Sequence, residues 1–448
     1  MLPATFNRLI FIYTVLPISL LLLSSFLVFA LPVGAVNWDQ CLNDIRNGTW
    51  TFGGRDNQGR PVPINASTTA ISYRLCREAC GTGPEPIQWS VFGQQFSSWL
   101  LPWLALISQL PFGANDKPDN LAAMLLTVGS PTLAAYSLAL TVLNGRWVAR
   151  RFASYNYPNA RKAAHILASL QQSPLRLASE APLLASLIVL SQNDKWWAEL
   201  EDRLDYSYTW SISAVASITW VAIAYVFTVI DTFTSDLTNG IYANGQAVAS
   251  LWIWLLPIVV GWLQISPKCD SKRSAKAVIR ANDIAYVAGF TPDHEPKLAR
   301  ETARETKYAI SLAQGQEQDS LRYDEKCTVP IYNYLRFLLW AQAVETVANA
   351  FHAASKNAYD RKTVNDPDEA WVEGELSPGI HHRNRTGTAE RVEKYCGSPG
   401  TRGMARLPLA EVWERMFIAS VIAISLQWGT TGAAVLAQWF TPTTGMSS

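Results

Sequence analysis

Five long stretches without a charged residue constrain the fold of this chain most strongly. A helix that crosses about 30 Å of hydrocarbon needs roughly 20 mostly apolar residues, and each stretch has about that length. Five such runs in one chain are hard to bury in a water-soluble core. The sequence therefore predicts an all-α fold, a multi-pass transmembrane helical bundle of about five spans. The stretches are residues 9–31, 121–143, 208–230, 248–266 and 416–438.

The composition agrees with a membrane location. Of the 448 residues, 49% are hydrophobic and 16% are charged, whereas soluble domains carry about 25% charged residues. The net charge of +1 gives no overall field that would attract nucleic acid. We therefore expect the lipid bilayer as the main partner and no nucleic acid, and the sequence indicates no particular protein partner.

Two further stretches leave the number of spans open. Segment 98–112 is short and contains two prolines, so it is either a span or a re-entrant or interfacial piece. Segment 332–354 has one narrow polar stripe at helical spacing, so it packs on the bundle or at the interface, or else spans with that stripe facing inward. The count rises to six or seven if they cross. The stripe comprises Gln342, Glu345, Asn349, His352 and Lys356.

The distribution of basic residues predicts the orientation. Lys and Arg gather on the cytoplasmic side of membrane proteins. Segments 144–162 and 267–280 each contain five basic residues, whereas loop 231–247 contains two acidic residues and no base. Loops 144–207 and 267–411 are therefore predicted inside, and 37–97 outside. This sidedness is typical of a multi-pass protein of the plasma membrane or secretory pathway.

Segments between the spans have their own character. Two amphipathic helices are expected within 160–206, with Trp196 and Trp197 as an interfacial anchor. A charged, solvated helix is expected at 295–313 and a partly flexible loop at 356–411. The predicted division is 1–36 signal anchor or cleaved signal peptide, 37–97 extracellular loop-rich domain, 98–143 re-entrant or interfacial segment plus span, 144–207 cytoplasmic helices, 208–266 two spans, 267–411 cytoplasmic helical and flexible region, and 412–448 last span and tail.

The outer region carries the marks of a secreted domain. Asn47 and Asn65 begin Asn-x-Ser/Thr motifs, which predicts N-glycosylation. Candidate disulfide partners in the same region are Cys41, Cys76 and Cys80. Their number is odd, so one stays free unless Cys396 supplies a fourth. Cys396 and a third motif at Asn384 would lie outside only if 332–354 crosses the membrane; we place both inside.

Four basic residues follow the 248–266 span directly. At helical spacing they lie largely on one side, where they could bind anionic head groups of the inner leaflet at about 1 kcal/mol each. The alternative is an ordinary positive-inside flank. These lipid-head-group candidates are Lys272, Arg273, Lys276 and Arg280.

Small residues and prolines mark points of helix packing. Gly429, Ala433 and Ala437 recur four apart, which favours close approach of the last helix to a neighbour. Pro131 and Pro257 interrupt predicted spans. Such interruptions are either kinks or, in transporters, binding sites.

No motif in the sequence predicts a reaction. A phosphate-binding P-loop, a nucleophile elbow and a zinc-protease helix are all missing from the 448 residues. The adjacent pair His381 and His382 has no further ligand at metal-binding spacing. We therefore expect no catalytic residue, no metal site and no cofactor. The preferred function is a non-enzymatic sensor or scaffold, and the alternative is a small-solute transporter or channel with Pro-kinked helices.

Segments 109–147, 251–262 and 426–445 resemble a family of fungal multi-pass membrane proteins without assigned activity. The resemblance extends over most of the chain after about residue 95. It implies a fungal plasma-membrane or endomembrane protein and nothing catalytic. It also implies further chain and more helices after TPTTG, so the last helix is expected to lack some of its packing partners.

Overall fold

The computed structural model forms two compact units, which we describe separately. Unit 1 comprises Met1–Ser98, Asp231–Gly245 and Trp439–Ser448, and unit 2 comprises Trp99–Ile230 and Gln246–Gln438. The predicted stretch 9–31 lies outside the described residues. The structure describes 37–48, 50–56, 59–65, 68–81, 101–110, 117–178, 180–206, 210–234, 253–268, 270–289, 295–302, 308–312, 330–366, 369–373, 379–397 and 408–440.

The described core of unit 1 is a small α+β domain. Helix α3 (Trp38–Asn47) is followed by strands β1 (Gly54–Arg55), β2 (Pro61–Val62) and β3 (Ala70–Ile71), and then by α4 (Tyr73–Ala79). The strands form an antiparallel sheet in the order β2-β1-β3. Asn37 and Ser72 cap the two helices through their side chains. This region is therefore more regular than the loop-rich domain that turn residues alone predicted.

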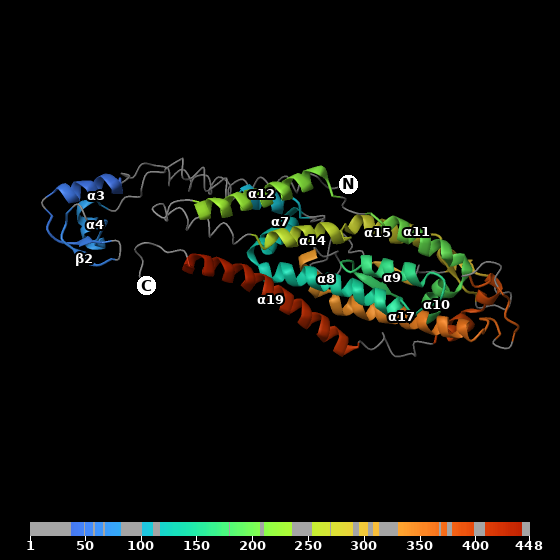
Figure 1. The fold of residues 1–448 in the computed structure, drawn as a ribbon. Helices are drawn as coiled ribbons and strands as arrows, with labels where there is room; N and C mark the ends of the chain where they lie inside the picture. The colour runs from blue at the N-terminus through green and yellow to red at the C-terminus, as the bar shows by residue number, and fades with distance from the viewer. Residues whose placement is uncertain are drawn as a thin grey trace, which may run out of the picture. The chain divides into compact units, whose positions relative to one another are not determined.

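Unit 2 is mostly helical, so the predicted all-α class is confirmed at that level (Figure 1). Short two-stranded pairings join β4 to β7 and β5 to β6. The helices are α6 (Leu101–Ile107), α7 (Lys117–Gly129), α8 (Pro131–Phe152), α9 (Ala160–Ser169), α10 (Ala181–Val189), α11 (Asp194–Leu204), α12 (Ile212–Thr234), α14 (Leu255–Ile265), α15 (Ser271–Asn282), α16 (Ala299–Thr302), α17 (Phe337–Tyr359), α18 (Ala389–Tyr395) and α19 (Leu409–Phe440), with 3₁₀ turns η3 (Ser191–Asn193), η7 (Pro330–Leu335) and η8 (His382–Arg385). The strands are β4 (Leu175–Leu177), β5 (Tyr286–Val287), β6 (Lys297–Leu298) and β7 (Ile310–Leu312).

The larger hydrophobic core gathers α8–α11, α15, α17 and α18. Trp196 and Trp197 are fully buried in it, so the interpretation as an interfacial anchor was wrong. Both indole N–H groups bond inside the core, to Asn282 Oδ1 at 3.1 Å and to the Leu187 carbonyl at 3.0 Å. A buried tryptophan needs such a partner. The pair is an internal packing unit.

Three local predictions for this region were wrong. Segment 160–206 forms α9, β4, α10 and α11 rather than two helices, because Pro174 and Pro182 separate the pieces. Within 295–313 the chain forms β6, α16 and β7, and β7 pairs with β4. Part of 356–411, expected to be flexible, forms η8 and α18, and α18 packs on α10. In the second and third cases, contacts with distant segments override the local charge pattern.

Helix α17 includes most of the predicted amphipathic stretch 332–354. About half of its residues are buried, and Glu345 of its polar stripe is one of them. That burial agrees with packing on the bundle rather than lying at an interface. Of the other stripe residues, Gln342 is half-buried, and Asn349, His352 and Lys356 are exposed.

The predicted span 121–143 is broken. Helix α7 ends at Gly129 and α8 starts at Pro131, with a bend of 105° between Leu121–Gly129 and Pro131–Phe152. Pro131 suits the first position of a helix, where its missing N–H has no partner to lose. Pro257 lies in the first turn of α14, so it does not kink a helix interior there.

The apolar helices can be compared with the length of a bilayer. Among described residues, no single helix is both long and apolar enough to cross a membrane, while the bent pair α7–α8 meets the length and composition test as a pair. Helices α12, α14 and α19 lie within or overlap the predicted stretches 208–230, 248–266 and 416–438. The predicted helical positions thus agree with the fold, and the number of spans stays a prediction.

Candidate functional site

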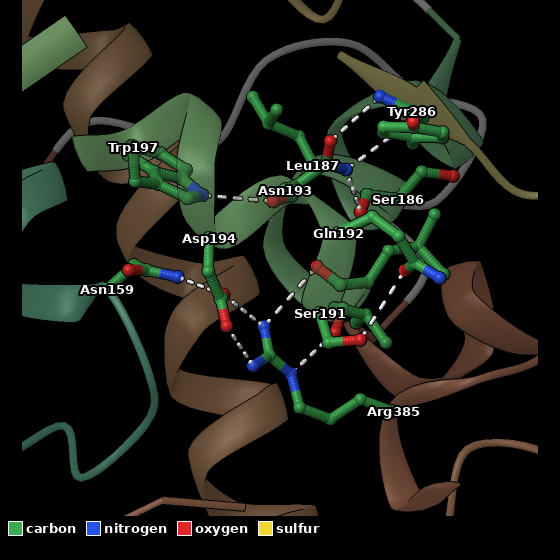
Figure 2. A network of polar contacts seen from close by, with 12 residues as sticks. Asn159, Ser186, Leu187, Ser191, Gln192, Asn193, Asp194, Trp197, Tyr286 and Arg385 are labelled. Atoms are coloured by element: carbon green, nitrogen blue, oxygen red, sulfur yellow. Dashed lines mark hydrogen bonds and ion pairs between the residues drawn. The ribbon is translucent and has the colours of Figure 1, made fainter. Parts of the chain in front are cut away.

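A polar network built around Arg385 joins three distant parts of unit 2 (Figure 2). The Arg385 side chain is 3% exposed and forms a bidentate ion pair with Asp194, at 2.8 and 2.7 Å. Its Nε donates to the Val189 carbonyl at 2.8 Å. Asn159 adds a bond to the Asp194 carboxylate at 2.6 Å. The guanidinium therefore connects η8 to the end of α10 and the start of α11, and Asp194 extends the network to the loop before α9.

The helix ends explain why these residue types meet. The C-terminal carbonyls of α10 carry partial negative charge, which a buried guanidinium neutralises. Asp194 is the first residue of α11, where a carboxylate is favoured by the helix dipole. Burial alone lowers the pKa of Arg385, but the hydrogen bond and charge of Asp194 outweigh this and raise it. The arginine is therefore charged at every physiological pH.

Asparagine side chains continue the network on the other side of α10. Asn193 donates to the carbonyls of Ser186 and Tyr286 at 2.8 and 2.9 Å, and accepts from the Tyr286 N–H at 2.8 Å. Asn282 donates to the Ile310 carbonyl at 2.9 Å while accepting from Trp196. These amides satisfy backbone groups of short strands that have few strand partners. Figure 2 shows Asn193 directed toward Tyr286 in this way.

The Arg385 network is a structural junction rather than a ligand site. All three guanidinium nitrogens already donate to protein oxygens. Neighbouring Tyr157 is buried, and burial raises the pKa of its phenol far above the usual range. Burial likewise raises the pKa of the Cys396 thiol, which disfavours its thiolate form. The arrangement holds segments together through bonds between protein groups.

A second polar cluster connects α8, α17 and α19. Arg415 lies over the ring of Trp147 at 4.0 Å and donates to Asn144 Oδ1 at 2.8 Å. Trp147 donates to Glu411 Oε2 at 2.7 Å. Nearby, Arg151 forms an ion pair with Glu345 at 3.1 Å. The cluster fixes the start of α19 against the bundle through charge and ring contacts.

A third group contains the predicted lipid-head-group residues. Helix α15 starts with the Asp270 cap, whose carboxylate accepts from the Arg273 N–H at 3.0 Å. Its apolar side is buried, and the four predicted bases, Lys272, Arg273, Lys276 and Arg280, are all exposed. The helix and the common side that spacing predicted are therefore both present.

The predicted glycosylation sites differ from the third motif in exposure. Asn47, at the end of α3, and Asn65, before β3, are exposed in unit 1. Asn384 is 1% exposed, and its amide donates to the Val372 carbonyl at 2.7 Å and accepts from the Val372 N–H at 3.1 Å. A glycan on the Asn384 Nδ2 would need space that this buried side chain does not have. The folded structure therefore has room for modification at the first two positions.

The cysteine pairing is decided in unit 1. Cys41 of α3 and Cys80 after α4 form a disulfide with a Cα–Cα distance of 5.7 Å, which lies in the usual range. Cys76 is free and half-buried, one helical turn before Cys80. Cys396 is a free, buried cysteine of unit 2. The fourth-cysteine alternative is thus not needed to complete a pair.

We expect tryptic peptide mapping under non-oxidising alkylation to recover a Cys41–Cys80 link and an alkylated Cys76. Trypsin can cut after Arg77, which separates Cys76 from Cys80. Replacing Cys41 with Ser should destabilise unit 1 by about 2–4 kcal/mol, as measured by denaturant unfolding of the full chain. Cys76→Ser is the matched control and should cost far less. A Cys41–Cys76 peptide would contradict the assignment.

The predicted packing stripe of α19 has no neighbour where it is described. The helix surface is open at Gly429: apart from its chain neighbours and the backbone of its own helix, nothing lies within 4 Å of the position a Cβ would take there. Ala433 is exposed, and the side chain of Ala437 lies outside the described residues. The close approach predicted from these small residues stays a prediction.

Sequence reasoning missed the residues that form the networks. Arg385, Asp194 and Arg415 stand in charged segments whose pattern is typical of a solvated surface, and their partners lie more than 190 residues away. One sequence signal for the Arg385 network is the run of charged residues in 381–394, which Asn and Thr interrupt within a segment predicted to be a loop.

In the part of the chain that the structure describes, no three His, Cys, Asp or Glu side chains come close enough to hold a metal ion.

His381 and His382 stack with ring centroids 4.2 Å apart, and His381 accepts from the Arg383 N–H at 3.3 Å. This pair therefore participates in the turn that starts η8.

Comparison of the chain with protein-family models, with curated proteins and with solved structures finds no match.

Proposed function

We propose that this chain is an integral, multi-pass membrane protein with a non-enzymatic scaffold- or sensor-type function. One observation supports it most: large apolar side chains are exposed along α12 and α19. On α12 they are Ile212, Val215, Trp220, Ile223, Val226, Phe227 and Ile230. On α19 they are Leu409, Trp413, Phe417, Val421, Ile422, Ile424, Trp428, Val435 and Leu436.

Such exposure is costly in water. Each large apolar side chain left exposed forgoes roughly 1.5–3 kcal/mol of burial free energy, and contiguous apolar patches mark membrane or protein contacts. By contrast, the exposed residues of α15 are mainly basic. A lipid environment around α12 and α19, with the module of α9–α11, α15, α17 and α18 outside it, accommodates both surfaces.

The non-enzymatic part of the proposal draws on the polar networks. The Arg385 and Asn193 groups bond to protein partners, which suits a rigid module that presents surface to other proteins. In this proposal the 37–97 region faces the lumen or exterior, and the α15 side faces the cytoplasm. The protein belongs to the plasma membrane or the secretory pathway.

Alkaline carbonate extraction of cell membranes tests the membrane assignment. We expect the full chain to stay in the pellet, with a glycosidase-sensitive mobility that is lost in the Asn47→Gln/Asn65→Gln variant. Asn384→Gln is the matched control and should leave the glycan pattern unchanged. Release into the supernatant would contradict the membrane proposal, and a glycan on Asn384 would contradict the proposed sidedness.

The scaffold role is tested by proximity labelling from the cytoplasmic module. Stable protein neighbours should be found with the native chain and lost when Asp194→Ala disrupts the module, while the chain stays in the membrane. A native chain without reproducible neighbours would remove the support for a scaffold.

A small-solute transporter is the second candidate, favoured by the break at Gly129–Pro131. After the break, a buried polar cluster joins α8 to η7 and consists of Ser137, Thr141 and Asn333. In it, Asn333 Nδ2 donates to Thr141 Oγ1 at 2.7 Å. Broken helices with nearby polar groups mark binding sites in transporters. Solute flux in reconstituted vesicles that Asn333→Leu abolishes would favour this candidate over a scaffold.

A further inference from the structure

Two cationic side chains share one aromatic ring at the junction of α14 and α15. Arg273 Cζ lies 3.9 Å from the ring centroid of Tyr206, and Lys268 Nζ lies 4.6 Å from it. Lys268 also donates a hydrogen bond to the Tyr206 carbonyl. Tyr206 itself is buried just after α11. The ring therefore gathers positive charge within a few residues of the apolar helix α14, which ends at Ile265.

Arg273 is arranged to accept an anion. A guanidinium stacked on a ring keeps its N–H groups in the plane, where they can bind a phosphate with two parallel bonds. The Arg273 side chain is exposed and has no ion pair among the described residues. The nearest acid in sequence, Asp270, already caps α15. Lys272 lies next to Arg273 and is also exposed.

We infer that Arg273 and Lys272 bind the phosphate of an anionic phospholipid head group, with Lys268 adding positive charge from the same ring. This inference rests on the proposed function, because it places a membrane surface at the end of α14. Charge complementarity identifies the partner. Three cations gather where the apolar helix α14 ends, and the anionic head groups of a bilayer lie at the same depth as the end of an apolar helix. The stacked arginine supplies geometry that an ordinary flank of basic residues lacks.

The four bases of α15 are not equivalent in this arrangement. In the view of Figure 1, α15 continues away from α14 along the length of unit 2. At 1.5 Å rise per residue, Arg280 lies about 12 Å farther along the helix than Lys272. Charges beyond about 8–10 Å are largely screened at physiological ionic strength. Lys272 and Arg273 therefore dominate, Arg280 contributes little, and Lys276, about 6 Å beyond Lys272 along the helix, makes a smaller contribution than either of the first two.

The test compares two charge-matched double variants of the full chain in phosphatidylcholine nanodiscs. Binding of a fluorescent phosphatidylserine is titrated by energy transfer from the protein. Lys272→Gln/Arg273→Gln should weaken binding about 30-fold, since each base near the surface supplies about 1 kcal/mol. Lys276→Gln/Arg280→Gln should change it less than threefold. Arg273→Lys keeps the charge but not the planar group, so its affinity for phosphatidylserine should lie between that of the native chain and that of the first double variant.

The outcomes separate this inference from the membrane proposal. Equal losses from both double variants, or none from either, would overturn the lipid site while the chain stays in carbonate-washed membranes. Inorganic phosphate that competes with the lipid at equal head-group concentration would also overturn it, because the site would then bind a free anion. Loss of the chain from washed membranes would instead contradict the proposed function itself.

Discussion

Asp194→Ala is expected to destabilise unit 2 more than Arg385→Ala does, although each removes the same ion pair. The reason is the burial of the partner that remains. Arg385 is 3% exposed, so without Asp194 it is a buried charge without its counter-ion, whereas Asp194 is 43% exposed and can be hydrated. Breaking a buried pair costs about 3–5 kcal/mol when the remaining charge stays buried. We expect that range for Asp194→Ala and roughly 2 kcal/mol for Arg385→Ala, from its lost charged hydrogen bonds.

The measurement is the free energy of unfolding of purified full chain in detergent, from denaturant titration. Glu373→Ala is the control, because its ion pair with Arg361 is about 70% exposed on both sides and should contribute less than about 1 kcal/mol. If Arg385→Ala proved the more damaging change, the junction would depend on the α10 carbonyls rather than on the ion pair.

Trp197→Ala is expected to have an effect of similar size for a different reason. The side chain is fully buried, with ring centroids 4.8 Å from Trp196 and 5.6 Å from Phe351. Removing a large buried aromatic side chain costs about 3–5 kcal/mol through lost burial and a residual cavity. Trp197→Phe keeps a ring and loses the bond to the Leu187 carbonyl, so it should cost less.

Exposed Trp220 of α12 provides the contrast for this prediction. Its side chain is 67% exposed, so Trp220→Ala should leave the unfolding free energy of the module within about 0.5 kcal/mol, as for surface positions. The two variants are compared in the same denaturant titration. A small loss for Trp197→Ala together with a large one for Trp220→Ala would restore the interpretation of Trp196 and Trp197 as a membrane-interface anchor.

Part of the candidate site could be predicted from sequence because it depends on neighbours along the chain. The bases of α15 repeat within one helix, so their common side follows from helical geometry. The exposure of all four agrees with that pattern. The ring beneath Arg273 could not be predicted, since Tyr206 lies more than 60 residues earlier and reaches α15 only through the packing of α11 on it.

The predicted flexible loop shows the same limit from the opposite side. Segment 356–411 has no long apolar period, because only a few of its apolar side chains, among them Ala389, Val392 and Tyr395 of α18, are buried in the core, and long-range polar bonds add to this packing. Asn384 bonds across to Val372, and Arg385 to Asp194. Charge and glycine content describe how a segment would behave alone, and they do not describe a segment whose polar groups find partners in a distant helix.

The sequence by itself determined the mostly helical class, the positions of the apolar helices α12, α14 and α19, and the basic side of α15. These properties repeat every few residues and need no partner. Only the tertiary structure decided that Cys41 pairs with Cys80, that the tryptophan pair is internal, and that Arg385 joins α10 to α11. Each of those outcomes depends on which distant segments the folded chain brings within bonding distance. A local periodic pattern does not indicate which distant segments these are.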